Sequence, residues 1–179
     1  MYTHKKAEVI MSQSMQKALK TAYEAEKEGM RNYMKFAKDT SVVSGKNMFI
    51  QLALDEIDHM EMIEKFMEKA LAGEMFTPVN VPPARISKFM PKVSDASRTK
   101  TEKSSVGDEA ALKIALVHEE KARNFYKDEA EKTHDAELKA FFIKLSEVEQ
   151  KHHDIIQAEL DFMAQDGFWF DAMEFSLEK

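Results

Sequence analysis

The stretch EIDH at residues 56–59 returns 93 residues later as EQKH at residues 149–152. Each stretch is a Glu-x-x-His motif, formed by Glu56 with His59 and by Glu149 with His152. Residues three apart in an α-helix lie on the same face, so each motif can present a carboxylate and an imidazole to one ion. The recurrence suggests that the chain is built from two related halves.

A glutamate and a tyrosine precede each motif at the same spacing. Glu26 and Tyr33 precede the first motif, and Glu119 and Tyr126 stand 93 residues after them. Seven residues are close to two helical turns, so each glutamate shares a helix face with its tyrosine. The matching positions predict a duplicated helical unit that carries the residue types of a metal site.

Apolar residues recurring at intervals of three and four predict four long helices. We expect helices over residues 12–39, with Ser12 as N-cap, and over 47–72, 108–133 and 135–165. Gly45 lies in a segment, residues 41–46, that we expect to be a turn. Gly73 and Gly167 follow the second and fourth helices as natural stops.

The segment 73–107 differs in character and is predicted to be a connector. It holds all four prolines and a polar run, with a short helix possible over residues 84–89. A helix of 25 residues is roughly 38 Å long, which a connector of this length can cross. We therefore expect a single all-α domain over residues 1–179, a four-helix bundle of two helical hairpins, residues 12–72 and 108–165, joined by a long crossover. The aromatic tail, residues 166–179, is expected to pack over the bundle or over a second subunit.

Composition excludes several classes of protein. The chain has no cysteine, which excludes disulfides, thiol nucleophiles and iron–sulfur clusters within these residues. A net charge of −6 argues against a nucleic-acid surface. The sequence contains neither an 18-residue apolar run nor a signal-peptide pattern, so we expect no membrane span and a cytoplasmic protein.

The repeated residues are expected to converge inside the bundle. Buried without compensation, four carboxylates would be strongly destabilising, whereas two divalent ions would balance their charge. We expect Tyr33 and Tyr126 to donate their hydroxyls to these carboxylates, and Asp55 either to hold a ligand histidine or to lie on the surface. The predicted metal ligands are Glu26, Glu56, His59, Glu119, Glu149 and His152.

Other histidines next to these motifs do not fit the repeat. Glu131 and His134 form a third Glu-x-x-His, but no counterpart stands 93 residues earlier, so we expect a solvated pair. His118 and His153 adjoin predicted ligands, and we expect each to be packed or to lie just behind the site.

The segments AEKEG at residues 25–29, with Tyr33, and DEIDH at residues 55–59, each echoed in the second half, resemble the rubrerythrin family of the ferritin-like superfamily. The resemblance covers residues 12–72 and 108–165 and implies a ferritin-like four-helix bundle. It also implies a centre of two non-haem iron ions, with Glu26 and Glu119 terminal and Glu56 and Glu149 bridging. His59 and His152 would then bind one iron each. Manganese and zinc accept the same ligand set.

Two features depart from the rubrerythrin pattern. Without cysteine, the chain lacks the rubredoxin domain that rubrerythrins proper carry, so electrons would come from a rubredoxin or a flavoprotein. Ala122 stands where the family places an additional glutamate. The leading hypothesis is an oxidoreductase, a peroxidase or oxidase, that reduces hydrogen peroxide or dioxygen and forms a homo-oligomer, a dimer. The alternatives are a ferroxidase that handles iron and a non-catalytic metal-binding bundle.

Overall fold

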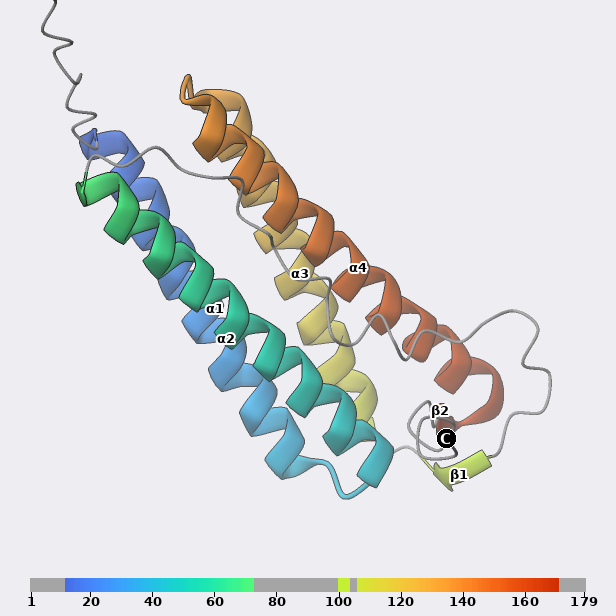
Figure 1. Ribbon diagram of the computed structural model, residues 1–179. Helices are drawn as coiled ribbons and strands as arrows, with labels where there is room; N and C mark the ends of the chain where they lie inside the picture. The colour runs from blue at the N-terminus through green and yellow to red at the C-terminus, as the bar shows by residue number, and fades with distance from the viewer. Residues whose placement is uncertain (1–11, 73–99, 104–105, 171–179) are drawn as a thin grey trace, which may run out of the picture.

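The computed structural model describes residues 12–72, 100–103 and 106–170, and shows four long helices (Figure 1). Their bounds are α1 Gln13–Asp39, α2 Val43–Ala72, α3 Val106–Lys132 and α4 Ala136–Asp166. Two short strands, β1 Lys100–Lys103 and β2 Phe168–Phe170, pair antiparallel at one end of the bundle. The prediction of an all-α four-helix bundle is confirmed.

The helices form two antiparallel hairpins, α1 with α2 and α3 with α4 (Figure 1). Helix α2 ends at one end of the bundle and α3 begins at the other, so these two helices run parallel. The chain between them must therefore pass along the length of the bundle, which is the arrangement of a long crossover. The helix suggested for residues 84–89 lies outside the described residues.

Local capping explains where the helices begin and end. The Ser12 side chain accepts a hydrogen bond from the Met15 backbone N–H at 3.1 Å, and Asp135 accepts one from that of Leu138 at 2.8 Å. Gly167 ends α4 in the left-handed conformation, with φ of 71°, and its N–H donates to the Met163 carbonyl. These contacts satisfy backbone groups that a helix end leaves without partners.

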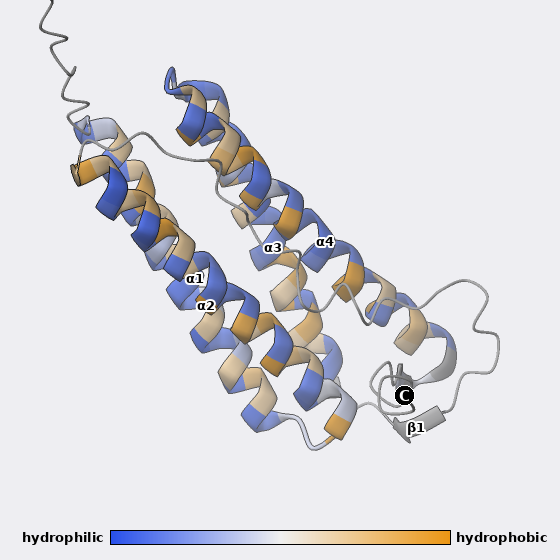
Figure 2. Ribbon diagram, viewed as in Figure 1, coloured by the Kyte–Doolittle hydropathy of each residue, from blue (hydrophilic) through white to orange (hydrophobic). Residues whose placement is uncertain are grey.

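Two apolar clusters fill the bundle. Along each helix, hydrophobic residues alternate with hydrophilic ones (Figure 2), as expected of helices with one buried face. One cluster includes Phe49, Leu52, Leu112, Ile156 and Trp169; the other includes Leu19, Ile63, Phe66, Phe142 and Leu145. Tyr33 belongs to the first cluster and Tyr126 to the second. The two tyrosines therefore anchor the polar site to apolar packing on both sides.

The predicted turn over residues 41–46 is wrong from Val43 onward, because α2 begins at Val43 and includes Gly45. Trp169, fully buried, packs against this helix: a Cβ on Gly45 would lie 2.6 Å from Cζ2 of the indole. The indole N–H donates to Asp108 at 3.3 Å. Gly45 thus serves close packing rather than a turn, and its partner is distant in sequence.

None of the four described helices combines the length and the continuous apolar character needed to cross a membrane.

The packing of Trp169 on α2 gives a stability prediction. Alanine favours a helix over glycine by about 1 kcal/mol, yet Gly45→Ala should lower the free energy of unfolding by about 1–3 kcal/mol, because the methyl group overlaps a rigid buried ring. Denaturant unfolding measures this change. In a Trp169→Leu background the same substitution should be tolerated, since the smaller side chain leaves room. A stabilising Gly45→Ala in the Trp169 protein would contradict this account of α2.

Candidate metal centre

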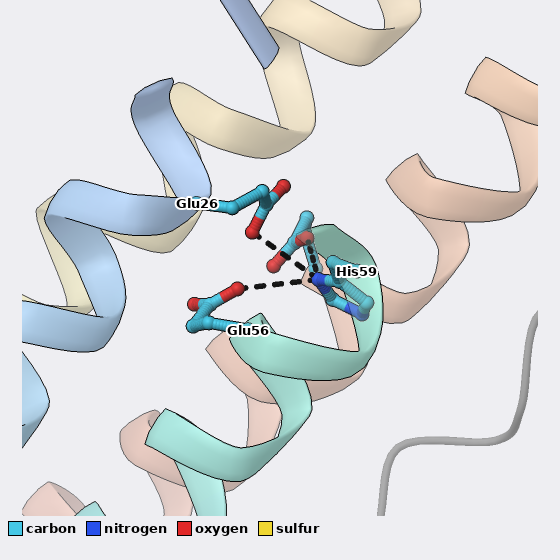
Figure 3. Close-up of side chains that lie close together, drawn as sticks. Glu26, Glu56 and His59 are labelled. Atoms are coloured by element: carbon cyan, nitrogen blue, oxygen red, sulfur yellow. Dashed lines mark hydrogen bonds and ion pairs between the residues drawn. The ribbon is translucent and has the colours of Figure 1, made fainter. Parts of the chain in front are cut away.

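The structure brings all six predicted ligands together in the middle of the bundle. Helix α1 contributes Glu26, α3 contributes Glu119, and α2 and α4 each contribute one Glu-x-x-His motif. None of the six residues is more than 2% exposed. Figure 3 shows Glu26 from α1 and Glu56 and His59 from α2 pointing toward one another. The side chains could hold ions only in the interior, away from bulk water.

The first group of side chains surrounds His59. Its Nδ1 lies 3.2 Å from Oε2 of Glu26, 3.2 Å from Oε2 of Glu56 and 3.1 Å from Oε1 of Glu149 (Figure 3). The ligand atoms of these four residues all lie within 4.8 Å of one another. Three carboxylate oxygens and one imidazole nitrogen are a donor set that suits a divalent transition metal.

The second group surrounds His152 and shares members with the first. Nδ1 of His152 lies 3.2 Å from Oε2 of Glu149 and 3.5 Å from Oε2 of Glu119. With Glu56, these residues again place ligand atoms within 4.8 Å of one another. Glu56 and Glu149 belong to both groups, so each can offer one oxygen to either of two adjacent ions.

The protonation states of the metal-free site follow from burial and proximity. Burial raises the pKa of Glu119 to about 8, and burial with the charges of Glu26 and Glu149 raises the pKa of Glu56 well above its ordinary value. Burial acts in the same direction on Glu149, but the nearby imidazoles outweigh it and hold the pKa of Glu149 well below its ordinary value. Protons therefore partly neutralise the carboxylates when no cation does.

The imidazoles carry the complementary charge. Burial opposes the charged form of both rings, but the surrounding carboxylates prevail and raise the pKa of His59 and of His152 well above the ordinary value. The two rings stack, with centroids 5.6 Å apart and planes 18° from parallel. Two like charges held this close favour replacement of the proton on each ring by a bound cation.

Several buried atoms of the site form no well-aligned hydrogen bond with any other described residue. They are both oxygens of Glu149, Oε2 of Glu119 and both ring nitrogens of His152. Each of these residues nevertheless lies close to groups of opposite charge. Buried polar groups are normally hydrogen-bonded, so such atoms call for another partner. Two cations would supply that partner, and the donor set therefore fits a pair of divalent ions.

The two tyrosines link the halves crosswise. The Tyr33 hydroxyl, on α1, donates to Glu119 on α3, and the Tyr126 hydroxyl, on α3, donates to Glu26 on α1. Burial, together with the charge of the acceptor carboxylate, raises the pKa of each phenol well above its ordinary value, so both stay protonated donors. The sequence predicted donation to a carboxylate, but the crosswise pairing is apparent only in the fold.

Asp55 lies inside the site rather than on the surface. Its Oδ2 is 3.3 Å from Nε2 of His152, and the residue is 3% exposed. The repeat counterpart of Asp55 is Val148, which is buried and apolar. Asp55 thus adds to His152 a neighbouring carboxylate from outside the candidate ligand set, and its repeat counterpart Val148 can add none to His59.

The other histidines that the structure describes, His118, His134 and His153, stay outside the two groups. Glu131 and His134 are exposed, as a solvated pair should be. His153 is partly buried and lies 3.5 Å from Asp154. His118 is half-buried, with its ring edge-on to Tyr33 at a centroid distance of 6.1 Å.

Cation binding should release protons from this site. With its pKa raised to about 8, Glu119 holds a proton near neutral pH, and the raised pKa values of Glu56 and of both imidazoles favour their protonated forms. A bound cation needs all of these groups deprotonated. Apparent affinity should therefore rise as pH increases from 6 to 8. Calorimetric titration with ferrous ion under anaerobic conditions, in two buffers of different ionisation enthalpy, measures the protons released. Equal enthalpies in both buffers would contradict this charge distribution.

Comparison with known proteins identifies the family. No curated protein and no solved structure gave a significant match to the chain. The family model described as Rubrerythrin matches residues 17–160, a range that spans all four helices and all six candidate ligands. The chain therefore belongs to the rubrerythrin family.

Proposed function

We propose that the protein is a non-haem di-iron oxidoreductase that reduces hydrogen peroxide or dioxygen, with peroxide as the favoured oxidant. The observation that carries this proposal is the sharing of Glu56 and Glu149 between two adjacent groups of ligand atoms. Two shared carboxylates would keep two ions at short distance, and paired ions are suited to two-electron chemistry.

The six candidate ligands would hold the iron pair with balanced charge. Glu26 and His59 would belong to one ion and Glu119 and His152 to the other, with the two shared carboxylates between them. The four negative charges of the carboxylates match the four positive charges of two ferrous ions. This match offsets the free-energy cost of burying the carboxylates or the ions alone. A pair of ferrous ions supplies the two electrons that reduce hydrogen peroxide, with two protons, to two molecules of water.

The protein itself would contribute positioning and exclusion of bulk water. Tyr33 and Tyr126 hold Glu119 and Glu26 through buried hydrogen bonds, and Asp55, 3.3 Å from the ring of His152, would help to orient it. The apolar clusters on both sides limit access of water to the site. Preorganised ligands of this kind need little rearrangement when the oxidant binds.

Turnover would also require a reductant, which we expect to be a separate rubredoxin or flavoprotein. Residues 1–179 include no cysteine that could bind rubredoxin-type iron. The exposed apolar side chains of Ile114 and Val117 on α3 are consistent with association of the chain as a homodimer.

Rapid mixing of the anaerobic, iron-loaded protein with oxidants tests this function. The visible absorption of the oxidised iron pair should develop at least about tenfold faster with hydrogen peroxide than with an equal concentration of dioxygen, a difference of about 1.4 kcal/mol in activation free energy. Equal rates would favour an oxidase. Continued oxidation of added ferrous ion, well beyond two per chain, would instead favour the iron-handling alternative.

The two kinds of Glu-x-x-His motif provide a matched control. His152→Ala should reduce bound iron below two per chain and remove the fast peroxide phase, because it deletes a buried candidate ligand. His134→Ala removes the exposed histidine of the third motif and should leave the amount of bound iron and the fast peroxide phase unchanged. Equal loss in the two variants would show that the iron is not bound at the buried cluster.

A further inference from the structure

His118 stands beside the metal centre, and no other described residue accepts or donates a hydrogen bond at its ring nitrogens. It precedes Glu119 on α3, is half-buried, and packs edge-on against Tyr33. Within the described residues, its ring makes this aromatic contact and neither a hydrogen bond nor an ion pair. A neutral imidazole in this condition keeps a lone pair that can bind an ion.

Gly29 allows His118 to approach the site. It lies within α1, one turn after Glu26, and does not adopt a positive φ, so the backbone does not require glycine there. Glycine in a helix interior costs about 1 kcal/mol relative to alanine. A Cβ at this position would lie only 2.5 Å from Nε2 of His118. The missing side chain therefore makes room for the imidazole.

The space beside Gly29, where a side chain would otherwise lie, also borders Glu56. A Cβ on Gly29 would lie 3.2 Å from Oε1 of Glu56, so this oxygen and Nε2 of His118 are no more than 5.7 Å apart, the sum of the two distances. It is the other oxygen of Glu56, Oε2, that contacts His59. Two ligand atoms on one ion lie at most about 4.2 Å apart, given bonds of about 2.1 Å. The two atoms would therefore need to approach each other by no more than about 1.5 Å to bind one ion.

Only one side of the centre has this arrangement. The repeat counterpart of His118 is Ala25, and the counterpart of Gly29 is Ala122. The duplicated ligands are thus accompanied by an unduplicated histidine and by the glycine that accommodates it.

We propose that His118 is a third imidazole ligand of the centre, which binds through Nε2 an ion shared with Glu56 when divalent metal is present. This inference rests on the proposed metal centre and adds a ligand to it. A third nitrogen donor would favour iron or zinc over manganese, since imidazole suits the former ions better.

Nuclear magnetic resonance of zinc-loaded protein labelled with ¹⁵N-histidine tests this proposal without reference to activity. Metal-bound imidazoles are recognised in long-range ¹H–¹⁵N spectra by nitrogen shifts that do not change with pH. The wild-type protein should show three of them. His118→Ala should lose one, and Gly29→Ala should lose the same signal because its methyl group displaces the ring. His134→Ala should retain all three.

The outcomes separate this proposal from the metal centre itself. Two metal-bound imidazoles, with two zinc ions per chain, would overturn the role of His118 and leave the six-ligand centre intact. No metal-bound imidazole at all would contradict both. Retention of three signals in the Gly29→Ala protein, with loss of one in His118→Ala, would overturn the role assigned to Gly29 alone.

Discussion

Four carboxylates buried at the centre of a small helical bundle are the constraint on which the rest of the structure depends. Each would be costly in an apolar interior if ionised alone. Three features offset this cost in the metal-free site. Stacked imidazoles bring positive charge, and tyrosine hydroxyls donate hydrogen bonds. The raised pKa values of Glu56 and Glu119 favour their neutral forms. Apolar clusters on both sides then supply the stability that the polar layer does not.

The duplicated sequence produces a centre that is nearly, but not fully, symmetric. The ligands and the tyrosines repeat, and their hydrogen bonds cross between the first and third helices. The surroundings do not repeat: the repeat counterpart of Asp55 is Val148, and the repeat counterpart of His118 is Ala25. Two ions bound here would therefore meet different environments, which is a means of giving each a distinct role.

Much of the fold and of the candidate site could be predicted because both follow from helical periodicity. Spacings of three and seven residues, repeated after 93, identified which side chains share a face. The start of α2 could not be predicted, because Gly45 resembles a turn residue in the sequence and only the fold shows its close packing against Trp169, 124 residues away. The crosswise tyrosine bonds, the Asp55 contact and the approach of His118 to Gly29 likewise depend on tertiary packing, which spacing along one helix does not reveal.

The separation of two bound iron ions tests the central claim most directly. Extended X-ray absorption at the iron edge, on protein loaded anaerobically, reports scattering of one iron by another. Because Glu56 and Glu149 belong to both groups of ligand atoms, the account predicts an iron–iron distance of about 3–4 Å, as in other two-metal sites. Iron bound without an iron neighbour at this distance would contradict a shared-carboxylate centre.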